Sequence, residues 1–154
     1  MILAKPDLFP RVAVVTVIYR CEKFMHGLLE SIAAVDYPHD RLEFHLVDNG
    51  AGDGSLAAAR REIERLSGNL PPVVIHEPGS NVGFAAGNNL GLAAAIERGA
   101  DYAFLLNPDA SFERAALKEA VAEAIAEHKR MGQPIVVWRG GQVTKIPPEE
   151  IVIP

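Results

Sequence analysis

The sequence predicts an α/β fold of the GT-A (Rossmann-like) kind: an open, mostly parallel sheet with helices on both faces. Four apolar segments of strand length recur along most of the chain. A segment with apolar residues at helical spacing follows each of them, and this alternation is typical of parallel sheets. Each apolar segment also ends in polar residues, glycine or proline, so polar groups collect at the edge where such sheets bind ligands.

Composition limits the class of protein. The chain has 154 residues, enough for one domain with a real core, and 49% hydrophobic against 23% charged residues is ordinary for a globular chain. A net charge of −5 argues against a nucleic-acid partner. The single Cys21 precludes an internal disulfide, fits a reducing compartment and is expected to be a small, semi-buried residue. No apolar run approaches about 18 residues, so we expect no membrane-spanning segment.

The first strand and helix are predicted from Val12 to Ile18 and from Phe24 to Val35. The strand is almost wholly apolar and β-branched, which suits a central strand covered on both faces. In the helix, Leu28 and Ile32 share the inward face. Pro38 disfavours helical backbone at the residue before it, so the helix should end there.

The second strand is predicted from Leu42 to Val47, and it leads into a glycine-rich loop from Asp48 to Ser55. Three glycines among polar side chains favour a tight loop. Either Asp53 or Ser55 is expected to cap the helix that follows. The apolar face of that helix consists of Leu56, Ala59, Ile63 and Leu66.

A short third strand is predicted from Pro72 to His76, and a helix opens after Asn81 and continues to Arg98. Leu92 and Ile96 are expected to face inward. Gly99 is a natural residue after the last helical turn, because glycine readily adopts positive φ.

The fourth strand, from Tyr102 to Leu106, is predicted to be buried and to stop at Pro108, which has no backbone N–H to donate. Ser111 is expected to cap the next helix. Its inward face consists of Leu117, Val121, Ile125 and His128.

The end of the chain changes character. Residues 135–138 and 142–146 are predicted to form a short C-terminal β-hairpin, because the intervening Gly140 and Gly141 can both adopt positive φ. We therefore expect a main domain over residues 1–130 and a hairpin tail over 131–154.

Polar residues after the strands have two interpretations each. Asp48 could accept hydrogen bonds from a ribose or a base, or serve as a turn or capping residue. Asp109 could hold a divalent cation together with a diphosphate, or end the strand in a turn. Asn88 and Asn89 are poor residues inside a helix and suit either ligand contacts or N-terminal capping.

Four motifs together resemble the family 2 glycosyltransferases, in particular the rhamnosyltransferase-like branch. They are V-T-V-I-Y (15–19), V-D-N-G-A-G-D-G-S (47–55), N-V-G-F-A-A-G-N-N (81–89) and L-L-N-P-D-A (105–110), within a match from about residue 12 to 126. The resemblance implies a GT-A fold. It also implies transfer of a sugar from a nucleoside-diphosphate donor, a dTDP- or UDP-sugar, to an acceptor hydroxyl with inversion.

The resemblance also implies roles for individual residues. Asp48 would bind the base or ribose, and Asp109 would bind Mg²⁺ or Mn²⁺ bridging the diphosphate. Asn107 replaces the first aspartate of the family's D-x-D motif, which leaves one charge to hold the metal. The residues implied to line the donor site are Tyr19, Asp48, Asn81, Gly83, Phe84, Asn88, Asn107 and Asp109.

The chain departs from the family pattern in two respects. Arg20 stands where the family commonly has asparagine. The family also continues past this length with a half that shapes the acceptor site and carries the base that deprotonates the acceptor hydroxyl. The tail over residues 131–154 does not match the family pattern. Neither Glu149 nor Glu150 in its proline-flanked part resembles that base, so the catalytic residue is unknown.

The family implies a saccharide or lipid-linked acceptor, as in cell-wall polysaccharide biosynthesis, and a place in the cytoplasm or at the inner face of the membrane. The alternative interpretation is an inactive donor-binding domain that serves as a binding or oligomerisation module. In that case the hairpin would mediate a homo-oligomer.

Overall fold

The computed structural model describes residues 9–50, 52–139 and 142–153, and it confirms the predicted α/β class. The strands are β1 (Val12–Ile18), β2 (Leu42–Asp48), β3 (Val73–His76), β4 (Tyr102–Leu105), β5 (Ile135–Arg139) and β6 (Gln142–Ile146). The helices are α1 (Met25–Ala34), α2 (Ser55–Arg65), α3 (Phe84–Glu97) and α4 (Ala116–Arg130). Three short 3₁₀ turns cover Glu22–Phe24, His39–Arg41 and Pro148–Glu150.

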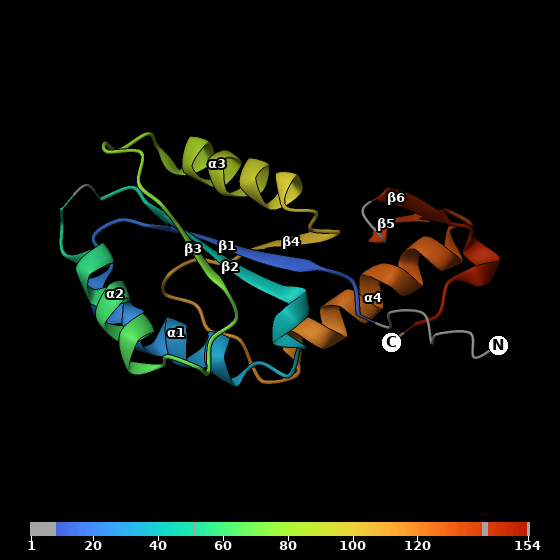
Figure 1. Ribbon diagram of the computed structural model, residues 1–154, viewed down its shortest axis with the longest axis horizontal. Coiled ribbons are helices and arrows are strands. Elements are labelled where there is room, and N and C mark those ends of the chain that lie inside the picture. Colours follow the sequence, from blue (N-terminus) through green and yellow to red (C-terminus); the bar gives the residue numbers. More distant parts are fainter. Residues whose placement is uncertain (1–8, 51, 140–141, 154) are drawn as a thin grey trace.

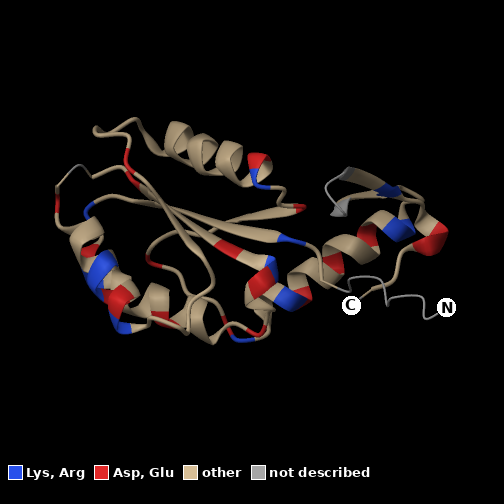
Figure 2. Ribbon diagram, in the orientation of Figure 1, with Lys and Arg blue, Asp and Glu red and all other residues tan. Residues whose placement is uncertain are grey.

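The central sheet is parallel, in the order β3-β2-β1-β4. Helices α1 and α2 lie on one face and α3 covers the other, while α4 runs from beneath the sheet toward the hairpin (Figure 1). Every residue of β1 is buried, as predicted for a central strand. Figure 2 shows that α2 carries many charged residues, whereas α3 is uncharged until its C-terminal turn.

Two apolar cores flank the sheet. The larger core joins the α1, α2 and α4 side, and its members include Val14, Leu28, Ile32, Phe44, Leu46, Ala59, Leu117, Val121 and Ile125. The smaller core lies under α3 and consists of Val15, Val17 and Val47, with Leu90 and Leu92 packed against them. The core therefore confirms the predicted inward faces of α1 and α4, with the exception of His128, which is only partly buried, and it confirms Leu92.

The predicted inward position of Ile96 in α3 is wrong, because this side chain is 72% exposed. The buried face of α3 consists of Gly87, Asn88, Gly91 and Ala95. A Cβ atom built on Gly91 would lie 2.4 Å from Cγ1 of Val15. The helix thus lies so close to the sheet that small residues form its contact face, and the larger Ile96 is turned to solvent.

The predicted burial of the fourth strand is also wrong. Its residues alternate between partly buried and exposed, and Leu105 is 53% exposed. The reason is position: β4 is an edge strand paired with β1, and α3 packs mainly over β1 and β2. The strand ends at Leu105, although Leu106 N still donates to Val15 O at 2.9 Å.

The helix ends show where the predicted caps lie. Ser111 does not cap α4, which begins at Ala116 after Ala115 without a side-chain cap. Neither Asp53 nor Ser55 is the N-cap of α2, which is Gly54 without a side-chain cap. Asp53 Oδ1 accepts the N–H of Ser55 at 2.8 Å, and Ser55 Oγ accepts the N–H of Cys21. Gly99 has φ +82°, as predicted for the residue after α3.

The C-terminal hairpin is confirmed by antiparallel pairing of β5 with β6, while the predicted Gly140–Gly141 turn lies outside the described residues. Ile135, Val137 and Ile146 are buried, whereas Val136 and Val143 on the other face are exposed. A homo-oligomer through this hairpin stays a prediction. Among the described residues, no helix combines the length and apolar character needed to cross a membrane.

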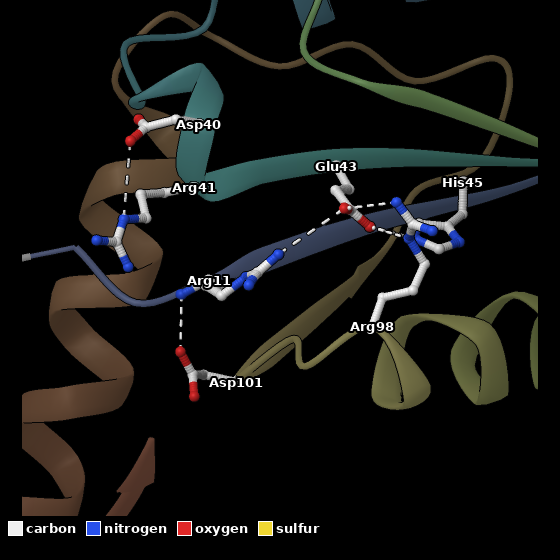
Figure 3. Close-up of polar contacts among 7 residues, drawn as sticks. All are labelled: Arg11, Asp40, Arg41, Glu43, His45, Arg98 and Asp101. Carbon is white, nitrogen blue, oxygen red and sulfur yellow. Dashed lines mark hydrogen bonds and ion pairs between the residues drawn. The ribbon is translucent and has the colours of Figure 1, made fainter. Parts of the chain in front are cut away.

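A polar cluster lies on the α3 side of the sheet, toward the end opposite the loops that follow the strands (Figure 3). Arg98 Nε and Nη2 donate to Glu43 at 2.7 and 3.0 Å, and Glu43 Oε2 lies 3.3 Å from Nε2 of the buried His45. His45 Nδ1 lies 3.1 Å from Nε2 of His76, and the two rings are stacked. These contacts suit two neutral imidazoles, with His76 Nε2–H donating to His45 Nδ1 and His45 Nε2–H donating to Glu43.

This histidine pair makes stability depend on pH. Burial lowers the pKa of His45 despite the nearby Glu43, and burial together with His45 lowers the pKa of His76. Both imidazoles thus take up protons more readily in the unfolded chain, whose histidines have pKa values near 6.5. We expect the free energy of unfolding to fall as pH decreases below about 6.5.

Denaturant unfolding between pH 5 and pH 8 measures this slope. A double variant, His45→Gln with His76→Gln, should flatten it, whereas His39→Gln, outside the pair, should retain it. A slope that the double variant leaves intact would contradict this assignment.

Candidate functional site

Loops that follow β1, β2 and β3 are joined at the carboxyl edge of the sheet. Asn49 N donates to Ile18 O at 2.9 Å, which ties the end of β2 to the end of β1. The buried Asn49 side chain then reaches the loop after β3: its Oδ1 accepts from Val82 N at 2.8 Å and its Nδ2 donates to Asn81 Oδ1 at 3.0 Å. These bonds give the rim a fixed shape.

Asn81 is held in this network, since its Oδ1 also accepts from Gly83 N at 2.9 Å. The sequence predicts Asn81 as a ligand contact and does not single out Asn49. The signal for Asn49 is the pair of polar residues at the end of β2, Asp48 and Asn49. The structure gives Asn49 the role of connecting the two loops.

Asp48 is only 6% exposed, and its Oδ1 accepts the N–H of Gly50 at 3.0 Å. The turn interpretation of this residue is therefore correct, and the residue also lines a pocket. The open pocket has a volume of about 490 Å³, and its lining is Asp48, Gly52, Gly54, Leu56, Ala57, Arg60, Glu77 and Gly79. Both roles considered for Asp48 are compatible with its position.

The pocket combines apolar and polar walls. Leu56 and Ala57 from the first turns of α2 contribute apolar surface, and Asp48 contributes hydrogen-bond acceptors. On another side Arg60 Nη2 donates to Glu77 Oε1 at 2.5 Å. A pocket of this size with a few polar groups suits a small flat ligand with a hydrogen-bonding edge.

The N-terminus of α3 also lies at the rim, after the loop that Asn49 holds. Gly83 precedes the helix with φ +86°, and Phe84 is 60% exposed. Asn88 does not cap the helix: it is buried, and its Nδ2 donates to Phe84 O one turn back. The first N–H groups of a 14-residue helix have no partner within the helix, which makes them suitable donors to an anion.

At the end of β1, Tyr19 and Arg20 are exposed, and the Arg20 guanidinium lies 5.1 Å from the centre of the Tyr19 ring. Arg20 has φ +48°, a left-handed conformation that is unusual for a residue with a side chain. Its N–H donates to Asp53 Oδ2 at 2.5 Å. The neighbouring Cys21 is buried, and burial raises the pKa of its thiol, in agreement with a structural role.

Asn107 and Asp109 follow β4, and both are exposed. Ala110 N donates to Asn107 O at 3.0 Å, so the segment forms a turn. Within the part of the chain that the structure describes, no three His, Cys, Asp or Glu side chains gather as a metal site. One exposed carboxylate suits a Mg²⁺ or Mn²⁺ ion whose remaining ligands come from phosphate oxygens and water.

This arrangement of loops on a four-stranded parallel sheet has known counterparts. The family model "Glycosyl transferase family 2" matches residues 13–152. The chain belongs to glycosyl transferase family 2. The family match includes every candidate site residue named above, and it continues into the C-terminal hairpin. No curated protein matches the chain.

Solved structures of glycosyltransferases share the fold. A mannosyltransferase from Pyrobaculum calidifontis, PcManGT in complex with GDP-Man and Mn²⁺, is 28% identical with a TM-score of 0.65, covering 77% of this chain and 33% of that one. S. aureus TarS 1–349 in complex with UDP-GlcNAc is 22% identical with a TM-score of 0.63, covering 78% and 32%. This family 2 chain thus spans about a third of the length of these structures.

Proposed function

We propose that this chain is the nucleotide-sugar-binding part of a glycosyltransferase that moves a sugar from a nucleoside-diphosphate donor to an acceptor hydroxyl. The observation that carries the proposal is the pocket beside Asp48, which lies at the carboxyl edge of a family 2 sheet. Parallel sheets bind ligands at this edge. In this proposal the donor-binding part is residues 1–130, and residues 131–154 form a hairpin tail that shares its core.

The chain's own side chains would bind the nucleoside. Asp48 accepts a hydrogen bond from a base N–H or a ribose hydroxyl, and Leu56 and Ala57 contact the flat face of the ring. Arg60, already oriented by Glu77, has further N–H groups to donate to a base carbonyl. Tyr19 covers the nucleoside from the end of β1.

The diphosphate would lie between the N-terminus of α3 and Asp109. The first N–H groups of α3 donate to phosphate oxygens, with Gly83 and Phe84 beside them. The Asp109 carboxylate, with the Asn107 amide oxygen beside it, would hold a divalent cation at this place. That cation would offset the negative charge of the departing nucleoside diphosphate.

The finer assignment follows the rhamnosyltransferase-like motifs: a dTDP- or UDP-sugar donor, inversion at the sugar carbon, and a saccharide or lipid-linked acceptor of the kind used in cell-wall polysaccharide synthesis. The two relatives described above were solved with GDP-Man and with UDP-GlcNAc, so both purine and pyrimidine donors deserve testing. The base that deprotonates the acceptor is not assigned.

Calorimetric titration with UDP, dTDP and GDP, each with and without Mn²⁺, tests the proposal. We expect one of the pyrimidine nucleotides to bind in the presence of Mn²⁺, and Mn²⁺ alone to bind weakly, because a single carboxylate needs the diphosphate to complete the coordination. Failure of all three nucleotides to bind with either Mn²⁺ or Mg²⁺ would overturn the assignment. Preference for GDP would retain the donor site and reject the pyrimidine assignment.

A further inference from the structure

Two loops at the candidate donor site are fastened together by Asp53 and Ser55. The two carboxylate oxygens of Asp53 accept different N–H groups: Oδ2 from Arg20 at 2.5 Å and Oδ1 from Ser55 at 2.8 Å. Ser55 Oγ accepts the N–H of Cys21 at 2.9 Å. The turn after β1 is therefore held by side chains 33 and 34 residues later in the chain. We refer to Asp53 and Ser55 as the clamp.

The clamp acts on a strained residue. Arg20 is the one residue other than glycine with positive φ in the described parts of the chain. A residue with a Cβ adopts the left-handed conformation about tenfold less readily than the right-handed one. Asp53 accepts a hydrogen bond from the N–H of Arg20 and thereby stabilises this left-handed conformation.

The electrostatics agree with this role. Although partial burial works in the opposite direction, the N–H groups of Arg20 and Ser55 hold the pKa of the Asp53 carboxyl below its usual value. The carboxylate is thus charged at neutral pH, and both of its oxygens are used by backbone donors. Asp53 is therefore engaged within the loop and differs from Asp48, which faces the pocket.

The left-handed Arg20 follows Tyr19 directly, and its guanidinium lies 5.1 Å from the centre of the Tyr19 ring. On the other side of Arg20, Cys21 is buried and donates its N–H to Ser55 Oγ. Because Cys21 is held in this way, a right-handed Arg20 would have to be accommodated by a shift of the exposed Tyr19. The family resemblance places asparagine at this position, and asparagine adopts the left-handed conformation more readily than arginine.

We propose that Asp53 and Ser55 are positioning residues that keep Arg20 left-handed and thereby hold Tyr19 in place for the donor nucleotide. The proposal rests on the donor-binding function proposed above. It assigns Asp53 a role beyond the start of α2, because the bond to Ser55 alone would not engage Arg20.

A backbone rescue experiment tests the clamp. Asp53→Ala should weaken nucleotide binding about tenfold, measured by calorimetry with Mn²⁺ present. In a chain that already carries Arg20→Gly, Asp53→Ala should lower the nucleotide affinity by less than about twofold, because glycine adopts positive φ without support. Arg20→Ala is the matched control: it removes the same side chain but retains Cβ, so the tenfold loss should persist there.

Each outcome is decisive. If Asp53→Ala lowered the nucleotide affinity equally in the Arg20→Gly and Arg20→Ala backgrounds, the proposed clamp would be wrong. Rescue in both backgrounds would also overturn it, because the effect would then belong to the arginine side chain. A wild-type chain that binds no nucleotide would overturn the donor site itself and, with it, the purpose assigned to the clamp. If Asp53→Ala does not fold, Asp53→Asn, which keeps one acceptor oxygen, replaces it in all three backgrounds, with a smaller loss expected and the same pattern of rescue.

Discussion

Replacing Asp109 by alanine is expected to lower the Mn²⁺-dependent affinity for the nucleoside diphosphate about 100-fold. Outer partners of a metal site alone are worth roughly 10–100-fold in affinity, and Asp109 would be a direct ligand. Since Asn107 stands where the family motif has its first aspartate, no second carboxylate of that motif can compensate. Calorimetric titration of the variant with and without Mn²⁺ measures the loss.

The matched control is Asp40→Ala, which removes another exposed aspartate, from the turn before β2, at the opposite end of the strand from Asp48. Its nucleotide affinity should equal that of the unmodified chain. The result that would contradict the assignment is an Asp109→Ala variant whose Mn²⁺-dependent affinity is unchanged. Affinity that was insensitive to Mn²⁺ from the start would instead show a nucleotide site that works without metal.

Replacing Gly91 by alanine is expected to destabilise the fold by about 2 kcal/mol, although alanine is the better helix residue by ~1 kcal/mol. The new Cβ would lie 2.4 Å from Cγ1 of Val15 and 3.3 Å from Cγ2 of Val47. Both valines are fully buried and β-branched, so they cannot rotate away without disturbing the smaller core. Thermal unfolding should show a loss of about 4–8 °C in Tm.

Gly27→Ala is the matched control, because Gly27 also lies inside a helix, α1, but a Cβ built on it meets no atom within 4 Å. It should gain up to ~1 kcal/mol from helix propensity. If Gly91→Ala proved as stable as Gly27→Ala, the close approach of α3 to the sheet would be refuted.

Local preferences made part of the fold predictable from the sequence, whereas the parts that depend on close packing were not. Residues 12–18 form a strand because β-branched apolar side chains favour that conformation locally, and this preference is visible in one sequence. The orientation of α3 depends on how closely it approaches Val15. Helical periodicity predicts the large Ile96 as an inward residue, whereas the buried face of α3 consists of Gly87, Asn88, Gly91 and Ala95.

The residues of the candidate site were likewise only partly predictable from the sequence. Asp48 was identifiable because it follows an apolar strand and precedes glycines, and it does line the pocket. Arg60 and Glu77, which form another wall, come from α2 and from the loop after β3, and no spacing rule connects them. The strain at Arg20 was equally invisible, since a left-handed residue other than glycine leaves no compositional mark.

The edge position of β4 has a consequence for handling the isolated chain. No described strand pairs with its outer side, and exposed apolar residues such as Leu105 lie along it. A strand edge whose backbone groups meet only water is a template on which another strand can form. The yield of monodisperse chain should therefore be limited by strand addition at this edge, and a lysine in place of Leu105 is the natural remedy for purification.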